Sequence, residues 1–222
     1  METSKPLQQQ AYEHLKGLIY QDFFSYDQIY SETKVAKEMG ISRTPMRDAI
    51  HRLSQERFLD IIPSKGFCLH QMNRQDIQET FQVRSAIEGY CTYLITKDFK
   101  MERAVSLFAQ LHENLNRQKE LLHTTKSVKD FVSIDNAFHL AIVQYAENHT
   151  LCDLFQSFLY RIQRLAILSL AHEGRMEETI QEHENILGAM EQGCINDIYS
   201  ITMLHMEKPK GLNLDDLRQS AA

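Results

Sequence analysis

Residues 31–67 read SETKVAKEMGISRTPMRDAIHRLSQERFLDIIPSKGF, and this stretch decides the fold of the first third of the chain. It predicts one short helix that begins after Ser31 and stops at Gly40. A second predicted helix carries Pro45 in its first turn, where a missing N–H group costs little. The period then changes, because apolar and β-branched residues flank a turn at residues 64–66, and this pattern predicts a β-hairpin.

A third helix is predicted upstream, over residues 8–20, because Ala11, Leu15 and Ile19 recur at helical spacing. Three helices followed by a hairpin form the order of a winged helix-turn-helix. The sequence therefore predicts a winged helix-turn-helix domain over residues 1–72, made of three helices and a hairpin wing.

The second half of the chain shows helical periodicity and no strand signal. It predicts a mainly α protein, in which residues 73–222 form an all-helical antiparallel bundle. A polar segment that contains Pro209 and Gly211 is expected to form a loose tail. The predicted helices of the bundle lie at about 74–97, 101–122, 127–147, 150–171, 175–192 and 195–207.

The charge distribution is uneven. The chain holds 24 Lys plus Arg and 30 Asp plus Glu, for a net charge of -6. Residues 1–70 carry nine basic and nine acidic residues, so the acidic excess lies in residues 71–222. No apolar run is long enough to span a membrane. The N-terminus lacks the features of a signal peptide, and the four cysteines are scattered, so a cytoplasmic protein with reduced thiols is expected.

The predicted helix after Ser42 is a candidate for reading the DNA major groove. Arg43 and Arg47 lie one turn apart on one face, and arginine can pair bidentately with guanine or phosphate. Ser42 and Thr44 can donate to phosphate at the helix start, and Lys65 lies at the predicted wing tip. The spacing alone leaves open a solvated charged face.

The same run resembles the DNA-binding domain of the GntR family of bacterial transcription regulators. Matching positions include Glu32, Gly40 and Pro45 as well as the arginines. Three features depart from the family pattern. Thr33 stands where many members have Arg, Arg57 stands where Gly is usual, and the loop before the second helix reads DFFSYDQ in place of G-x-L-x-P-G. The resemblance implies contacts with double-stranded operator DNA from Thr33, Ser42, Arg43, Thr44, Arg47, Lys65 and Gly66.

A candidate metal site lies in the second half. Asp135 and His139 are four residues apart and interrupt an apolar helical stripe, and His183 and His205 each interrupt another. A buried charge needs a partner, and three imidazoles with one carboxylate suit a divalent transition metal with open positions. Hydrogen-bonded polar residues in a helical core remain the alternative from spacing alone.

Residues 74–207 resemble the FCD effector-binding domain of the FadR-type branch of that family. The resemblance implies that Asp135, His139, His183 and His205 bind a metal, most often zinc but nickel or manganese in some members. It also implies that a carboxylate effector completes the coordination. Arg84 matches a family position that faces the cavity, although a salt bridge from Arg84 to Glu88 explains it equally well.

These patterns indicate a ligand-responsive transcriptional regulator and predict a repressor. The resemblance implies a homodimer, which is expected to bind a palindromic operator and to sense a small organic acid or sugar acid at the metal. A helical-bundle metallohydrolase is the alternative, but the chain contains no H-E-x-x-H motif. A helical interaction module without an effector is the third reading.

Overall fold

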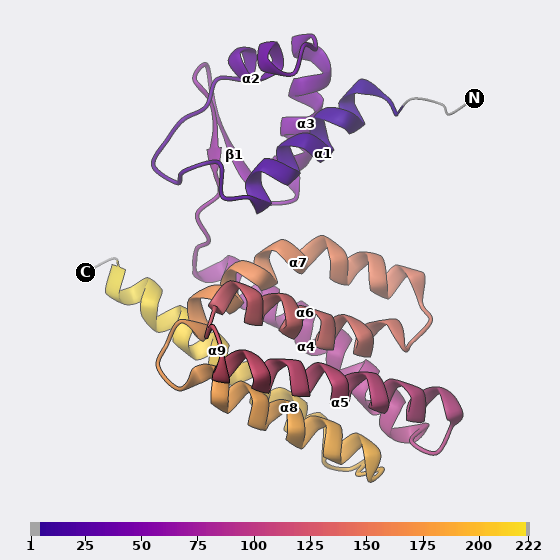
Figure 1. The fold of residues 1–222 in the computed structure, drawn as a ribbon. Coiled ribbons are helices and arrows are strands. Elements are labelled where there is room, and N and C mark those ends of the chain that lie inside the picture. The colour runs from indigo at the N-terminus through magenta and orange to yellow at the C-terminus, as the bar shows by residue number, and fades with distance from the viewer. Residues whose placement is uncertain (1–4, 221–222) are drawn as a thin grey trace. The chain divides into compact units, whose positions relative to one another are not determined.

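The computed structural model describes residues 5–220 and divides into two compact units, with the boundary between Met72 and Asn73. The first unit contains three helices and a two-stranded hairpin, and the second contains only helices in its described part (Figure 1). The prediction of a mainly α protein with an N-terminal winged helix-turn-helix and an all-helical second domain is confirmed.

The first unit packs its helices and hairpin around one apolar core. Met46, Ile50 and Leu53 line the buried face of the third helix, and Leu15 and Phe67 reach the same core from the first helix and the hairpin. The elements are α1 (Leu7–Tyr20), α2 (Glu32–Glu38), α3 (Arg43–Gln55), β1 (Leu59–Ile62) and β2 (Gly66–Leu69).

Local signals set the ends of α2 and α3. The Ser31 hydroxyl caps α2 by accepting from the Lys34 N–H group, and Gly40 follows the helix at a φ of 67°. Arg57 follows α3 at a φ of 62°. This left-handed conformation costs a residue other than glycine about 1–2 kcal/mol. Arg57 therefore adopts the left-handed conformation that the usual glycine would adopt without strain.

The wing is an antiparallel pair in which Leu59 faces Leu69 and Ile62 faces Gly66. Gly66 has a φ of 134°, and a Cβ atom added there would lie 2.0 Å from the Tyr30 carbonyl oxygen. Glycine is therefore required because the backbone before α2 crosses the wing at this point.

The second unit is a bundle of six helices within the described residues (Figure 1). Helix α4 packs against α9, and α5 packs against both α6 and α8. The core includes Ile95, Leu111, Phe131 and Phe138. The six helices are α4 (Arg74–Lys97), α5 (Glu102–His123), α6 (Val128–Gln144), α7 (His149–Leu170), α8 (Arg175–Glu191) and α9 (Ile198–Ser220).

The prediction of a loose tail from Pro209 onward is wrong. Helix α9 continues through Pro209 to Ser220. Proline removes a backbone N–H group from a helix interior, which normally ends or bends the helix. Here the lost backbone bond is offset by the buried Asn213 side chain. It makes a tertiary contact by donating to the Leu165 carbonyl of α7 (3.2 Å), and it also donates to the Pro209 carbonyl one turn earlier in α9 (2.7 Å).

Asn213→Ala is expected to destabilise the full chain by about 1–3 kcal/mol, because it removes two buried hydrogen bonds that hold α9 together and against α7. Urea unfolding followed by circular dichroism measures the change. Asn116→Ala, at an exposed asparagine of α5, is the matched control. Equal unfolding free energies for the two variants would contradict the role assigned to Asn213.

Candidate metal centre and nucleic-acid interface

A groove of about 200 Å³ lies in the first unit between the start of α3 and the wing. Helix α3 contributes Arg43 and Arg47, and the wing contributes Lys65. Thr33, at the start of α2, completes the polar wall. Four residues with donor side chains that were predicted from the sequence to contact DNA therefore line one concave surface. Gly66 also lines it, but it is buried against Tyr30 and shapes the wing that presents Lys65.

The side chains of α3 and its N-cap differ in the contacts that they already make within the protein. Ser42 occupies the N-cap position, yet its hydroxyl makes no capping bond within the described residues, and Thr44 is exposed. The Arg47 Nε lies 3.6 Å from the Glu32 Oε2. Arg52 points elsewhere, because its guanidinium stacks on the Tyr12 ring at 3.8 Å. Of the arginines in α3, Arg43 and Arg47 thus remain available for DNA.

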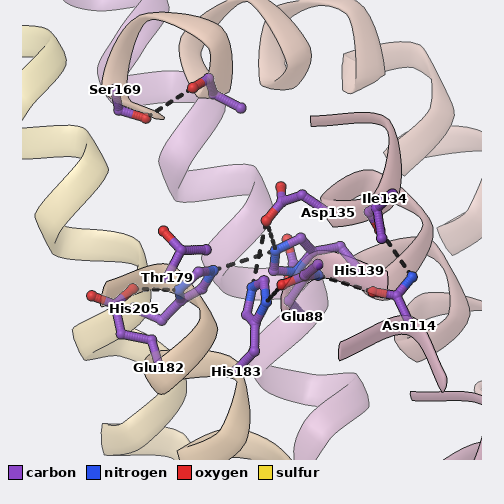
Figure 2. A network of polar contacts seen from close by, with 12 residues as sticks. Glu88, Asn114, Ile134, Asp135, His139, Ser169, Thr179, Glu182, His183 and His205 are labelled. Atoms are coloured by element: carbon purple, nitrogen blue, oxygen red, sulfur yellow. Dashed lines mark hydrogen bonds and ion pairs between the residues drawn. The ribbon is translucent and has the colours of Figure 1, made fainter. Parts of the chain in front are cut away.

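The second unit brings all four predicted metal ligands together (Figure 2). Asp135 and His139 lie one turn apart on α6, His183 lies on α8, and His205 lies on α9. The three histidines offer nitrogens within 4.8 Å of one another. The Asp135 Oδ1 lies 3.6 Å from the Nε2 of His183 and 3.8 Å from that of His139.

The spacing of these atoms suits one metal ion. The Nε2 atoms of His139 and His205 are 3.3 Å apart. Two nitrogen ligands of a tetrahedral zinc ion, at bond lengths of about 2.1 Å, lie about 3.4 Å apart. The Nε2 of His183 is buried and has no hydrogen-bond partner in residues 5–220. Such an orphaned acceptor is costly in a protein interior unless a ligand satisfies it.

The second ring nitrogen of each histidine, Nδ1, lies near an oxygen that can accept a hydrogen bond from it. The Nδ1 atoms lie 2.5 Å from the Glu88 Oε2 for His139, 3.2 Å from the Gln118 Oε1 for His183, and 2.8 Å from the Glu182 Oε2 for His205. Such contacts place the proton on Nδ1 and leave the Nε2 lone pair free. All three Nε2 lone pairs are therefore free, and together the three atoms could hold a metal ion.

The protonation states agree with this arrangement. Burial lowers the pKa of His183 well below its usual range, and burial also lowers the pKa of His205. Burial alone would raise the pKa of Glu88, but Arg84 and His139 outweigh it and hold that pKa at about 2. Burial likewise opposes ionisation of Glu182, yet hydrogen bonds from His205 and Arg175 hold its pKa at about 2. At neutral pH these two histidines are neutral, and both carboxylates are charged.

A small cavity of about 20 Å³ borders the cluster. Three of the four candidate ligands line it, and so do Arg84 and Arg175. The Arg84 Nε donates to the Glu88 Oε1 at 2.7 Å, so the predicted salt bridge is present. The Arg84 Nη2 is nevertheless buried without a partner among the residues that the structure describes. Arg84 thus combines the ion pair with a free donor beside the cavity.

Comparison with known families agrees with both halves of this description. Residues 7–69 match the family described as bacterial regulatory proteins, gntR family, and residues 79–208 match the FCD domain. The chain belongs to the GntR family and carries an FCD domain. It is thus a DNA-binding transcriptional regulator.

Individual relatives of this GntR-family regulator are distant but align over most of their length. The HTH-type transcriptional regulator YdhC of Bacillus subtilis is 25% identical over 84% of this chain and 81% of its own. The HTH-type transcriptional repressor RspR of Escherichia coli is 24% identical over 86% of this chain and 82% of its own. The solved structure of E. coli McbR/YncC has a TM-score of 0.69 at 19% identity, covering 98% of this chain and 99% of that one, and shows the shared fold.

The matched families and these relatives are transcriptional regulators and not enzymes, which argues against the metallohydrolase alternative. The three-histidine cluster has to be interpreted within a DNA-binding protein. Between residues 5 and 220, none of the helices is long and apolar enough to cross a membrane.

Four residues of the cluster were not predicted from the sequence in their observed roles. Glu88 was identified only as a partner of Arg84, and Gln118, Glu182 and Arg175 were not identified at all. Gln118 follows Leu111 and Leu115 at helical spacing, so a polar residue in an apolar stripe was a usable signal. No comparable sequence signal identifies Glu182. Its role depends on a hydrogen bond with His205, which lies on a different helix.

Proposed function

We propose that this GntR-family protein is a ligand-responsive repressor that binds a palindromic operator as a homodimer and senses a small carboxylate at a divalent metal. The observation that carries the proposal is the convergence of the Nε2 atoms of His139, His183 and His205 beside Asp135, each histidine with an oxygen at Nδ1. A repressor is favoured by the similarity to RspR, which is a transcriptional repressor.

The donor set fits a divalent transition metal, with zinc as the first candidate and nickel or manganese as others. Three imidazoles and one carboxylate form a nitrogen-rich set of borderline softness. With a coordination number of five or six, the bound ion would act as a Lewis acid and keep open positions for an anionic ligand beside the four side chains. The protein's part is to hold the four ligands on three helices. It also keeps a proton on each histidine Nδ1, because Glu88, Gln118 and Glu182 each offer an oxygen that accepts a hydrogen bond there.

The charge of the cluster favours an anionic effector. Asp135, Glu88 and Glu182 are acidic, and Arg84 and Arg175 are basic, so a divalent ion would leave one net positive formal charge. The cavity of about 20 Å³ beside these arginines has room for roughly one water molecule. A carboxylate must therefore displace side chains to enter.

A wider groove between α8 and α9 is a poorer candidate for the effector. It has a volume of about 550 Å³, but Glu182, Glu184 and Asp197 line it. These acids repel a carboxylate, and the groove lacks the unpartnered arginine donors of the smaller cavity. The chemistry therefore favours the small cavity over the large one.

Arg84→Lys is expected to weaken carboxylate binding by about tenfold, because lysine cannot keep the bond to Glu88 and also present a second planar donor. One charge-assisted hydrogen bond is worth about 1.5 kcal/mol. Calorimetry on the zinc-loaded full chain with acetate, lactate and citrate measures the effect. Arg117→Lys, at an exposed arginine of α5, is the control. Identical carboxylate affinity in both variants would remove Arg84 from the effector site.

Operator reading is assigned to the groove between α3 and the wing, with Arg43, Arg47 and Lys65 as its cations and Ser42 and Thr44 at the helix start. Few cations per copy make a single domain a weak binder, so two copies on two half-sites are expected. An effector acts by binding one arrangement of the dimer more tightly than the other.

Two measurements on the full-length protein test the proposal. Selection of DNA from a random pool at low salt is expected to return a palindrome. Metal analysis of protein purified without added metal is expected to find about one divalent transition-metal ion per chain. A non-palindromic selection result would contradict operator reading by a two-fold dimer, and a metal-free protein that fails to bind added zinc would contradict the sensor.

A further inference from the structure

The group that faces Nδ1 of His183 differs in kind from the groups that face Nδ1 of His139 and His205. His139 and His205 face carboxylates at Nδ1, and a carboxylate can only accept there. His183 faces the side-chain amide of Gln118, with 3.2 Å between Nδ1 and Oε1. An amide can offer either its oxygen or its NH2 group, so the proton position on His183 depends on which end of Gln118 it meets.

That choice decides whether His183 can bind a metal. If Gln118 presents its oxygen, Nδ1 carries the proton and the Nε2 lone pair is free. If Gln118 presents its NH2 group, Nδ1 must accept, and the proton moves to Nε2, which lies 3.6 Å from the Asp135 Oδ1. The second arrangement would put a hydrogen where the ion is expected. The orientation of one buried amide therefore controls one ligand.

The structure contains a chain of donors that sets this orientation. The Asn114 Nδ2 donates to the Ile134 carbonyl at 2.9 Å (Figure 2). A carbonyl can only accept, so the Asn114 oxygen has to face the other way, toward Gln118. The Gln118 Nε2 donates to that oxygen at 2.9 Å, which leaves the Gln118 oxygen for His183. The direction of every bond follows from the backbone carbonyl at one end.

Packing keeps these groups in place. Gln118 and His183 are both fully buried. The His183 ring stacks on Phe138 with a centroid distance of 4.2 Å and an interplanar angle of 15°. Asn114 and Gln118 lie one turn apart on α5, a helix that contributes no ligand itself. Ile134 directly precedes Asp135, so the chain of bonds connects the ligand turn of α6 with the ligand on α8.

We infer that Asn114 and Gln118 are positioning residues that fix the proton of His183 on Nδ1 and so keep its Nε2 free to bind the metal. The inference rests on the proposed metal site, but the state of the His183 proton is a property of the metal-free chain. A pure packing role for the two amides would need only their volume, whereas this role needs the direction in which they donate.

Nitrogen chemical shifts of His183 in the metal-free full-length protein test the inference directly. Histidine labelled with nitrogen-15 and the variant His183→Gln, which identifies the signal, are sufficient. We expect the proton on Nδ1. A proton on Nε2 in the wild-type protein would overturn the inference, and this measurement does not depend on whether any further variant folds. A proton on Nδ1 in a protein that binds no zinc would instead contradict the proposed metal site.

A pair of variants then separates the effect of hydrogen-bond direction from the effect of side-chain volume. Asn114→Leu keeps the size but frees the Gln118 amide to turn, so we expect a partial shift of the proton to Nε2 and about a 10- to 100-fold loss of zinc affinity. Adding Gln118→Glu to that variant supplies an acceptor in either orientation. It is expected to return the proton to Nδ1 and zinc affinity to within a few-fold of wild type.

Competition with a chromophoric chelator measures the zinc affinities, and circular dichroism confirms the fold. Recovery in the double variant supports the directional role. If Asn114→Leu is folded and leaves the His183 proton on Nδ1, the inference is overturned. It is overturned equally if the folded double variant stays as weak as Asn114→Leu.

Discussion

Replacement of His183 by alanine is expected to lower the affinity of the chain for zinc by more than about 100-fold. Loss of an outer partner of a metal ligand typically costs 10- to 100-fold, and loss of a ligand itself should cost more. His183 is the candidate ligand with the strongest structural case, because its buried Nε2 has no hydrogen-bond partner in the described residues. Competition with a chromophoric chelator measures the affinity.

The matched control for this variant is His112→Ala. His112 is an exposed histidine of α5 whose Nε2 contacts Glu191 at 2.7 Å, away from the cluster. Zinc affinity in that variant should equal that of the wild type. Tight zinc binding by a folded His183→Ala protein would show that metal binds elsewhere and that the cluster is a hydrogen-bonded core.

Arg47→Ala is expected to weaken operator binding by more than about 30-fold while the fold stays intact. One bidentate contact between arginine and guanine is worth about 1–3 kcal/mol, and a dimer on two half-sites loses it twice. The change should not unfold the first unit, because Arg47 is exposed and its contact with the half-buried Glu32 is long, at 3.6 Å. Fluorescence anisotropy with the selected operator measures affinity.

The control for Arg47→Ala makes the same charge change in the other unit. Arg117→Ala removes an exposed arginine from α5 and should leave operator affinity unchanged. Circular dichroism confirms that both variants are folded. Operator affinity in Arg47→Ala equal to that of the control would refute the assignment of α3 as the reading helix.

The first unit could be predicted closely from the sequence because its signals are local. Ser31, Gly40 and Pro45 mark helix ends within a few residues of where they act. The apolar stripe of α3 and the turn at residues 64–66 complete the winged helix-turn-helix. Each of these features depends on neighbours in the chain, so a single sequence contains the information.

The second unit could be predicted only in part. Helical spacing places Asp135 and His139 on one face, but their convergence with His183 and His205 depends on how three helices pack. The spacing of residues along one sequence does not predict how the helices pack. The convergence of the four residues was predicted from the family resemblance. The link from Glu182 to His205 escaped prediction for the same reason. The continuation of α9 through Pro209 was missed because tertiary contacts outweighed a strong local signal for a helix end.

Helices α4, α5, α6, α8 and α9 all contribute a ligand or the oxygen behind a ligand to the histidine cluster. An ion at this point would bind the folded bundle and not the unfolded chain, which cannot assemble residues so far apart in sequence. By mass action, each tenfold rise in free metal above the dissociation constant then adds about 1.4 kcal/mol to the stability of the second unit. We expect its midpoint of thermal unfolding to rise with free zinc, so that the supply of metal also sets how much folded regulator there is.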